Sequence, residues 1–317
     1  MFTSKLSISM RQYVLAVLLA IVIAPGQAAS ERCGDLQRRI ETLLMPPLEA
    51  SISIALIDLQ SHCYAAVNGD RPIAMMSVYK LPIILTALAA TDDGLDLGRS
   101  VRVTTADIVS GHSPLADELR RRGSRNRTLR ELASEAMLHS DNTSSDILLA
   151  QLGGPAAVRK FLFAKSHGGI SVDRFEREIE RDYGTARLHD ALTERRDSAS
   201  ANSLAKLIAD LYAGRLMSAR ASAEAIDLMQ QVATGSRRLR AGLAPQWRLA
   251  HKTGTGELPS GFNIATNDAG MIEGPHGERM IAVVLIGSGH ANFAQREALI
   301  ADVARQAIIW LSAGTPD

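Results

Sequence analysis

The chain has 317 residues, with 35 lysines and arginines against 34 aspartates and glutamates, 46% hydrophobic residues and two cysteines. This length suffices for one large or two modest domains with a proper core. The near-zero charge argues against a nucleic-acid-binding protein, since such proteins are usually strongly basic. The apolar fraction argues against wholesale disorder. Two cysteines are too few for a disulfide-dense scaffold or a four-thiolate zinc site. The composition therefore predicts a soluble, globular chain.

The first 28 residues are typical of a secretory signal peptide. Lys5 and Arg11 precede an apolar run from Tyr13 to Ala24, and small residues follow up to Ala28. An uncleaved membrane anchor is the alternative, but the 12 apolar residues rise only about 18 Å as a helix, short of the ~30 Å bilayer core. We expect cleavage near Ala28 and a periplasmic or secreted protein with no stable membrane anchor. Its charged residues would then number 33 against 34, a net charge of −1.

Export would place the two cysteines in an oxidising compartment, where disulfides persist. A bond between Cys33 and Cys63 would tie the first helix to the first hairpin. By the chain-entropy estimate, closing a loop of this length stabilises the fold by about 3–4 kcal/mol. Two unpaired thiols are the alternative, because spacing alone does not determine geometry.

The hydrophobic pattern divides the rest of the chain into three parts. Residues 31–45 have apolar side chains at helical spacing, and two strand-like runs follow at Ser51–Leu59 and His62–Val67. From Ser77 to Gly235 the pattern is almost entirely helical. The clearest helical segments are Leu81–Ala90, Thr128–Leu138, Ser144–Leu152, Ala156–Ala164, Ser203–Tyr212 and Ala221–Val232. The last part contains three strand patterns and an amphipathic helix, at Arg248–Lys252, Phe262–Ile272, Arg279–Ile286 and Gln295–Leu311.

This order of elements predicts an α+β fold. Both ends of the chain would build one antiparallel sheet flanked by the terminal helices, with an all-helical domain inserted in the middle. We assign residues 29–75 and 235–317 to the discontinuous α/β domain and residues 76–234 to the helical domain. Residues 119–127 are expected to form a basic, solvated surface loop.

Common motifs for metal, phosphate and nucleotide sites are absent from the sequence. It contains no HExxH, CxxC, GxxxxGK[ST], complete GxGxxG or GxSxG pattern. The eight histidines are scattered, with no pair at ligand spacing. We therefore predict neither a metal site nor another cofactor.

A Ser-x-x-Lys motif runs from Ser77 to Lys80, where a strand-rich segment gives way to a helix. Backbone N–H groups and the helix dipole favour developing negative charge at such a place. The i, i+3 spacing puts Lys80 within reach of the Ser77 hydroxyl, and a desolvated lysine can activate a serine as a nucleophile. The same pattern at Ser203 and Lys206 lies inside a predicted helix, and we interpret it as chance.

A second motif, Ser140-Asp141-Asn142, lies between two predicted helices. The Ser140 hydroxyl can relay a proton to a leaving nitrogen, and the Asn142 amide can hold a substrate carbonyl. The alternative is structural, because Asp141 or Asn142 would equally well cap the following helix.

The third motif, Lys252-Thr253-Gly254, ends a predicted strand, where the glycine permits close backbone approach. Its lysine and hydroxyl can bind a carboxylate. The next N–H group, that of Thr255, can form an oxyanion hole together with that of Ser77. The second and third motifs are weak individually, but all three in this order form a strong signal.

With these three motifs, residues 31–313 resemble the class A serine β-lactamases, within the larger penicillin-recognising family of transpeptidases and β-lactamases. The resemblance implies that Ser77 is the acylated nucleophile and Lys80 its proton partner. It implies that Ser140 passes a proton to the lactam nitrogen and that Asn142 orients the substrate. The implied partners are small-molecule β-lactams, and a monomer is the expected state.

The same resemblance concerns the binding of the substrate carboxylate. Lys252 and Thr253 would bind it, and Arg238 matches members that place an arginine there to help. Thr266 occupies the strand position where other members keep their arginine.

Rapid release of the acyl group separates a β-lactamase from a penicillin-binding protein, and it needs a base that activates water. Residues 173–180 resemble the class A loop that carries this base, and the match falls on Glu176. A positioned general base contributes roughly 10²–10⁴-fold. Glu178 and Glu180 are rivals for this role, and a solvated charged helix face is the structural alternative.

The loop also departs from the family pattern. Arg177 stands where a proline usually follows the glutamate, and Glu180 stands where an asparagine helps to hold the hydrolytic water. Several additional residues precede Arg196. The resemblance therefore favours a β-lactamase, with a slowly deacylating D,D-peptidase or β-lactam sensor as the runner-up. A non-catalytic cell-wall binding module is the third alternative.

Overall fold

The computed structural model describes residues 25–45 and 47–314, with the backbone alone for residues 25–29. The predicted signal peptide falls outside the described residues as far as position 24. Its last four residues, 25–28, form the start of the first helix. Signal-peptide cleavage near Ala28 thus stays a prediction.

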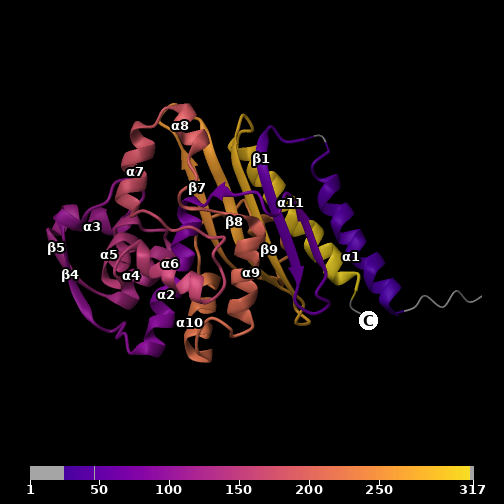
Figure 1. Cartoon of the computed structure of the whole chain (residues 1–317), viewed down its shortest axis with the longest axis horizontal. Coiled ribbons are helices and arrows are strands. Elements are labelled where there is room, and N and C mark those ends of the chain that lie inside the picture. The colour runs from indigo at the N-terminus through magenta and orange to yellow at the C-terminus, as the bar shows by residue number, and fades with distance from the viewer. Residues whose placement is uncertain (1–24, 46, 315–317) are drawn as a thin grey trace, which may run out of the picture.

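A five-stranded antiparallel sheet lies at the centre, in the order β2-β1-β9-β8-β7 (Figure 1). Its strands are β1 (Ala50–Asp58), β2 (Tyr64–Val67), β7 (Arg248–Glu257), β8 (Asn263–Glu273) and β9 (Arg279–Gly289). In the pairing of β1 with β9, Ile54 lies opposite Val284, so the two ends of the chain share one sheet. The α+β fold class predicted from the order of elements is confirmed.

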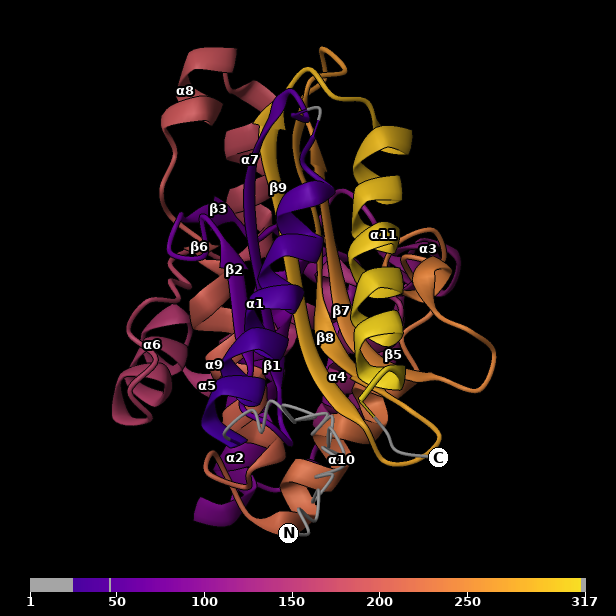
Figure 2. The same cartoon turned by 90° about the vertical axis from the view of Figure 1, so that its right-hand side faces the viewer.

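The two terminal helices, α1 (Pro25–Thr42) and α11 (Phe293–Ser312), pack together over one face of the sheet (Figure 2). Ile54 of β1 belongs to the apolar cluster on this side, with Leu36 of α1 and Ile300 of α11. The next residue, Ala55, belongs to the cluster on the opposite face. This change of side follows the two-residue period of a strand, so both faces of the sheet are covered.

Helices fill most of the chain between β2 and β7. They are α2 (Lys80–Ala89), α3 (Pro114–Arg122), α4 (Leu129–Leu138), α5 (Asn142–Leu152), α6 (Pro155–Ala164), α7 (Glu176–Thr185), α8 (Leu188–Thr193), α9 (Ala201–Tyr212) and α10 (Ala219–Gln230). Short 3₁₀ turns are η1 (Met76–Tyr79), η2 (Ala90–Asp93), η3 (Thr105–Asp107) and η4 (Leu239–Gly242). The exact domain boundaries stay a prediction.

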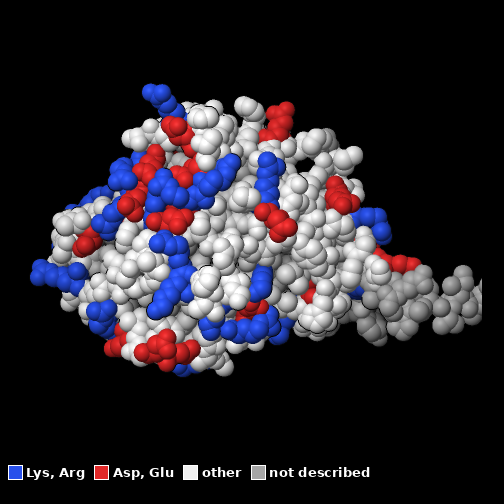
Figure 3. All heavy atoms as spheres, viewed as in Figure 1, with Lys and Arg blue, Asp and Glu red and all other residues white. Residues whose placement is uncertain are grey.

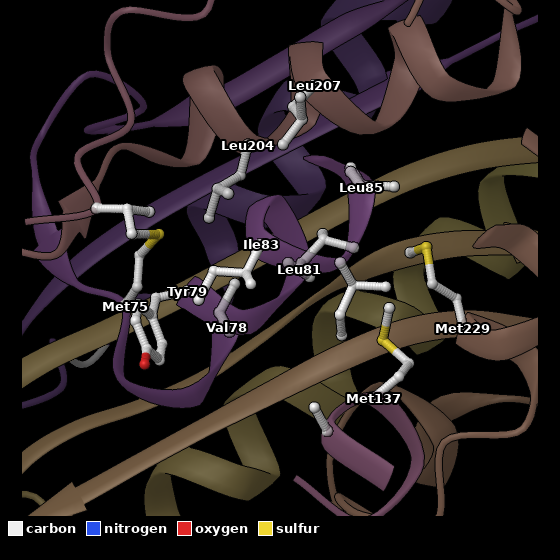
Figure 4. Packing of buried hydrophobic residues seen from close by; sticks show 14 of the residues in the cluster. Met75, Val78, Tyr79, Leu81, Ile83, Leu85, Met137, Leu204, Leu207 and Met229 are labelled. Carbon is white, nitrogen blue, oxygen red and sulfur yellow. The ribbon is translucent and has the colours of Figure 1, made fainter. Parts of the chain in front are cut away.

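The helix α2 is the centre of the inserted part, because its sequence is apolar on nearly all sides and every residue from 80 to 88 is buried. Figure 4 shows Leu81 and Leu85 of α2 together with Leu204 of α9, Met137 of α4 and Met229 of α10. Surrounded in this way, α2 gives the turn η1 at its start a rigid support.

Two small sheets between β2 and β7 were missed by the sequence prediction. They pair β3 (Ile73–Ala74) with β6 (Ser198–Ala199) and β4 (Ser100–Thr104) with β5 (Ser124–Thr128). The expected basic loop at 119–127 was wrong, since its residues end α3 and form β5. Arg125 and Arg127 of β5 both pair with Glu118, and Arg127 also pairs with Glu135 at 2.9 Å. A half-buried strand held by ion pairs of its arginines has no apolar alternation that would reveal it in the sequence.

Charges of both signs are interspersed on the face seen in Figure 3, over the helical part of the molecule. This pattern agrees with the near-equal numbers of acidic and basic residues. Within the described part of the chain, a bent pair formed by α5 and α6 passes a length-and-composition test for a membrane span, and no single helix does.

A disulfide joins Cys33 of α1 to Cys63, the residue before β2, with their Cα atoms 5.1 Å apart. The two cysteines are 30 residues apart in the sequence. The bond ties α1 to the edge of the sheet, on the side where α1 packs against β2. No free cysteine is present among the described residues.

We expect the double variant Cys33→Ala, Cys63→Ala to lose about 3–4 kcal/mol of unfolding free energy, because the unfolded chain regains the entropy of an open loop. Urea denaturation of the oxidised protein measures this difference. A reducing agent should bring the wild-type midpoint close to that of the variant. Equal midpoints for the oxidised wild type and the variant would contradict the prediction.

Candidate active site

Ser77 lies in the turn η1, directly ahead of α2, and Lys80 is the first residue of α2. The Lys80 ammonium is fully buried and donates to three oxygen atoms at 2.9 Å each: Ser77 Oγ, Asn142 Oδ1 and Glu176 Oε1. An ammonium has three N–H donors, so each donor has a partner. The lysine thus joins residues from η1, α5 and α7 in one cluster.

Strands β7 and β8 of the sheet support the turn that carries Ser77. Met76, the residue before Ser77, has a φ of 47°, a left-handed conformation that non-glycine residues seldom adopt. The Asn267 side chain of β8 donates to the backbone oxygens of Ala74 and Met75 at 2.9 and 3.0 Å. A Cβ atom at Gly254 of β7 would lie 2.3 Å from Met75 O, so only glycine permits this approach.

Ser140 and Lys252 form a second contact pair in the site. Lys252 Nζ donates to Ser140 Oγ at 3.0 Å and to Thr253 O at 3.1 Å. Ser140 has a φ of 59° at the end of the connection into α5. Burial, followed by the charge of Lys80, lowers the pKa of Lys252 well below its ordinary value. Thr253 Oγ1 lies 2.6 Å from the hydroxyl of Thr234.

The capping alternative for the second motif applies to Asp141. Its carboxylate accepts from Ser144 N at 2.7 Å and is the N-cap of α5. Asn142 instead turns its amide to other partners, since Oδ1 accepts from Lys80 and Nδ2 donates to Ser110 O and Glu180 Oε1. One residue therefore caps the helix and its neighbour contacts the buried lysine.

The three glutamates of the loop have different partners. Only Glu176, at the start of α7, contacts Lys80. Glu178 accepts from Phe175 N at 2.9 Å and so caps the helix, while Glu180 accepts from the Asn142 amide. The geometry therefore distinguishes Glu176 from the two rivals that the sequence left open.

Asp146 of α5 fixes the start of α7. Its buried carboxylate accepts from Glu176 N at 2.6 Å, from Arg177 N at 3.2 Å and from Arg177 Nε at 2.7 Å. Arg177 stands at the position of the expected proline, and its two bonds to Asp146 hold the backbone there. Burial raises the pKa of Asp146, while the bonds from Arg177 and Glu176 act to lower it.

A cavity of about 340 Å³ opens beside these groups, between α7 and the end of β7. Its lining includes Met76, Ile179, Glu180, Tyr183, Thr255 and Leu258. In the part of the chain that the structure describes, no cluster of three or more His, Cys, Asp or Glu residues could hold a metal ion.

Comparisons with known proteins agree with this arrangement. Residues 35–311 match the beta-lactamase enzyme family. The β-lactamase VEB-1 of Pseudomonas aeruginosa is 29% identical over 301 residues, which cover 94% of this chain and 96% of VEB-1. The chain belongs to the beta-lactamase enzyme family. The family resemblance predicted from the three motifs is confirmed.

Solved structures of the family share the fold. A variant of the last common ancestor of Gram-negative bacteria beta-lactamase class A is 28% identical, with a TM-score of 0.73, and the match covers 91% of this chain and 100% of that one. The extended-spectrum beta-lactamase TLA-3 has a TM-score of 0.80 at 23% identity, with coverage of 88% and 99%.

Arg238, predicted to help bind a carboxylate, is buried behind β7. Its guanidinium donates to Gly254 O at 3.1 Å, to Asn267 O at 2.9 Å and to Thr255 Oγ1 at 2.5 Å, and Nε faces Glu297 at 3.4 Å. Of the site residues predicted from the sequence, Thr255 is the one to which the Arg238 side chain donates a hydrogen bond. Thr255 is exposed, whereas Arg238 is buried.

Thr266 lies on β8 directly opposite Thr255 of β7. This is the strand position at which the resemblance places an arginine in other members. Arg238, which precedes η4, donates to the hydroxyl of Thr255, the β7 residue opposite Thr266. Its guanidinium therefore lies near the strand position at which other members have an arginine.

The loop at residues 173–197 is closed at its base by Arg174 and Asp197. Their side chains are almost fully buried, and Arg174 Nε donates to Asp197 Oδ2 at 2.7 Å. Asp197 Oδ1 also accepts from Asp173 N, and Asp197 O accepts from Met75 N at 2.9 Å. The loop that carries Glu176 is therefore bound to the segment that carries Ser77.

Sequence reasoning missed Asn267, Asp146, Arg174 and Asp197 as supports of the site. The first two had a weak signal, since each is a polar residue within a predicted element, Asn267 in the strand pattern Phe262–Ile272 and Asp146 in the helix pattern Ser144–Leu152. A buried polar side chain requires partners, so each pointed to a specific contact. Arg174 and Asp197 lie in a charged stretch and had no such signal.

We expect Arg174→Ala to reduce the unfolding free energy by about 3 kcal/mol, because it leaves the buried Asp197 carboxylate without its cation. Trypsin should also cut the 173–197 loop faster than in the wild type. Arg159→Ala is the control, since its ion pair with Asp173 is half exposed and contributes less than about 1 kcal/mol. Similar losses for the two variants in chemical denaturation would contradict the prediction.

Proposed function

We propose that this protein is an exported serine β-lactamase that hydrolyses the β-lactam amide through an acyl-enzyme on Ser77. The observation that carries the proposal is the triple contact of Lys80 Nζ with Ser77, Asn142 and Glu176, each at 2.9 Å. This contact supports the proposal, because a nucleophile, a proton partner and a second base would then belong to one hydrogen-bonded group.

In the acylation step, Lys80 first passes a proton to the Glu176 carboxylate. As a neutral amine it then takes the proton of the Ser77 hydroxyl while Oγ attacks the lactam carbonyl carbon. The N–H groups of Ser77 and Thr255 stabilise the negative charge on the carbonyl oxygen. The carbon–nitrogen bond then breaks, and the nitrogen takes a proton from the Ser140 hydroxyl. The proton held by Glu176 replaces it at Ser140, so Glu176 is again a carboxylate. The Lys252 ammonium, 3.0 Å from Ser140 Oγ, supports the transfer from Ser140.

In the deacylation step, Glu176 takes a proton from a water molecule, whose oxygen attacks the ester carbonyl. The bond to Ser77 Oγ breaks, and the serine takes back through Lys80 the proton that Glu176 removed from water, while the opened product leaves. Glu176 is suited to this role because it is buried and held at two points. Its carboxylate accepts a hydrogen bond from Lys80, and its backbone N–H donates to Asp146.

The substrate carboxylate has its own group of contacts in this proposal. Lys252 supplies the positive charge, and the hydroxyls of Thr253 and Thr255 donate to the carboxylate oxygens. Arg238 adds its charge from behind β7 and orients the Thr255 hydroxyl through the 2.5 Å contact. Binding of the anion would also supply a counter-charge for the buried Lys252.

Two alternatives remain for experiment. A D,D-peptidase or β-lactam sensor of the same fold would acylate Ser77 and stay acylated, and the altered loop favours this as the runner-up. The contact between Glu176 and Lys80 favours hydrolysis instead. Catalytic turnover of a reporter cephalosporin would exclude the sensor, and one-to-one labelling would support it. A non-catalytic cell-wall binding module would bind peptidoglycan fragments without labelling of Ser77.

We expect Glu176→Gln to accumulate a covalent adduct on Ser77 with the mass of the intact β-lactam, because acylation continues while water activation is lost. Turnover should fall by about 10²–10⁴-fold. Intact-protein mass spectrometry and steady-state hydrolysis measure the two effects. Ser77→Ala is the control and should form no adduct. Equal turnover by Glu176→Gln and the wild type would refute the assignment of the base.

The lowered pKa of Lys252 predicts how activity depends on pH. Its cation is lost at a pH below the ordinary lysine value of 10.5, so kcat/KM for a substrate with a carboxylate should fall on the alkaline side below that value. Lys252→Arg keeps its charge to higher pH, and the fall should move upward. The methyl ester of benzylpenicillin is the control substrate and should lack this shift. An identical alkaline limb in both enzymes would contradict the prediction.

A further inference from the structure

Glu180 contacts the same asparagine that contacts the catalytic lysine. It lies four residues after Glu176 on α7, so the two carboxylates share one face of the helix. Glu180 Oε1 accepts a hydrogen bond from Asn142 Nδ2 at 3.1 Å. The acceptor is a carboxylate, and the bond is therefore stronger than one between neutral groups when Glu180 is ionised.

The polar atoms of the Asn142 amide all have partners. The oxygen accepts from Lys80 at 2.9 Å, and the nitrogen donates to Ser110 O and to Glu180, both at 3.1 Å. A side-chain amide has two N–H hydrogens, and these two acceptors use both. A substrate carbonyl that accepts a hydrogen bond from Asn142 Nδ2 must therefore displace one of these two acceptors.

The surroundings hold Glu180 in this contact. Gly111 has a φ of 81°, and a Cβ atom there would lie 2.5 Å from Glu180 Oε1 and 2.8 Å from Asn142 Nδ2. The segment after Ser110 therefore packs tightly over the bond. Burial, followed by the charge of Glu176, raises the pKa of Glu180, while Lys80 and the bond from Asn142 act to lower it.

We propose that Glu180 is a specificity-determining residue, which holds the Asn142 amide hydrogen that an acylamino carbonyl would take and so favours β-lactams without an acylamino side chain. The proposal rests on the function proposed above. Binding an acylamino carbonyl at Asn142 exchanges a bond to a carboxylate for a bond to a neutral oxygen, and it leaves a partly buried carboxylate without its donor. A β-lactam that lacks this carbonyl avoids both costs.

The test compares kcat/KM for benzylpenicillin, which has an acylamino group, with kcat/KM for penicillanic acid, which lacks one. In a mechanism with an acyl-enzyme, kcat/KM reports the steps up to acylation, so effects on deacylation do not enter. We expect Glu180→Ala to raise the benzylpenicillin-to-penicillanic acid ratio about tenfold. Glu180→Gln should raise it less, because its amide oxygen still accepts from Asn142.

Glu178→Gln is the matched control, since it removes one charge from the same helix and keeps a capping oxygen. Its ratio should stay within twofold of the wild type. An unchanged or lower ratio in both Glu180 variants would overturn the inference, as would an equal rise in Glu178→Gln. If the wild type hydrolyses neither substrate and neither substrate labels Ser77 in Glu176→Gln, by intact mass, the proposed function itself has failed. Glu180→Gln keeps the test decisive if Glu180→Ala does not fold.

Discussion

The structure of the site depends on the burial of one ammonium group, that of Lys80. A buried charge without partners costs several kcal/mol, so a lysine can be enclosed here only if acceptors converge on it. Its three acceptors come from η1, α5 and α7, which are far apart in the sequence. The same contacts that make the burial tolerable also bring Ser77 and Glu176 together. The contacts that stabilise the buried Lys80 charge are therefore the same contacts that assemble the site.

A second buried lysine, Lys252, adds a positive charge to the site. Lys252 has no carboxylate among its hydrogen-bond acceptors, Ser140 Oγ and Thr253 O, and Lys80 lowers its pKa further. In the proposed function the substrate carboxylate supplies the missing negative charge. Around the site, Arg238 donates to the backbone oxygens of Gly254 on β7 and Asn267 on β8. The Asn267 side chain in turn donates to the backbone oxygens of Ala74 and Met75.

Local patterns predicted most of the fold and the positions of the three motifs. The strands and long helices have a strong apolar periodicity in the sequence, because one or both faces of each element are buried in the core. The pattern failed for the strand β5, where ion pairs of Arg125 and Arg127 with Glu118 replace apolar burial. It also could not choose among Glu176, Glu178 and Glu180, because acidic residues two or four apart look alike in a charged helix. Only their contacts distinguish them.

The sequence by itself determined the order of the main elements, the family and the candidate site residues, since these depend on residue type and short spacing. The tertiary structure alone decided which groups meet. It brought Glu176 into contact with Lys80 and closed the 173–197 loop through the ion pair of Arg174 with Asp197. It also oriented the Asn142 amide so that it bonds to both Lys80 and Glu180. Such contacts are set by the packing of helices around α2 and the sheet, where burial requires each polar group to find a partner.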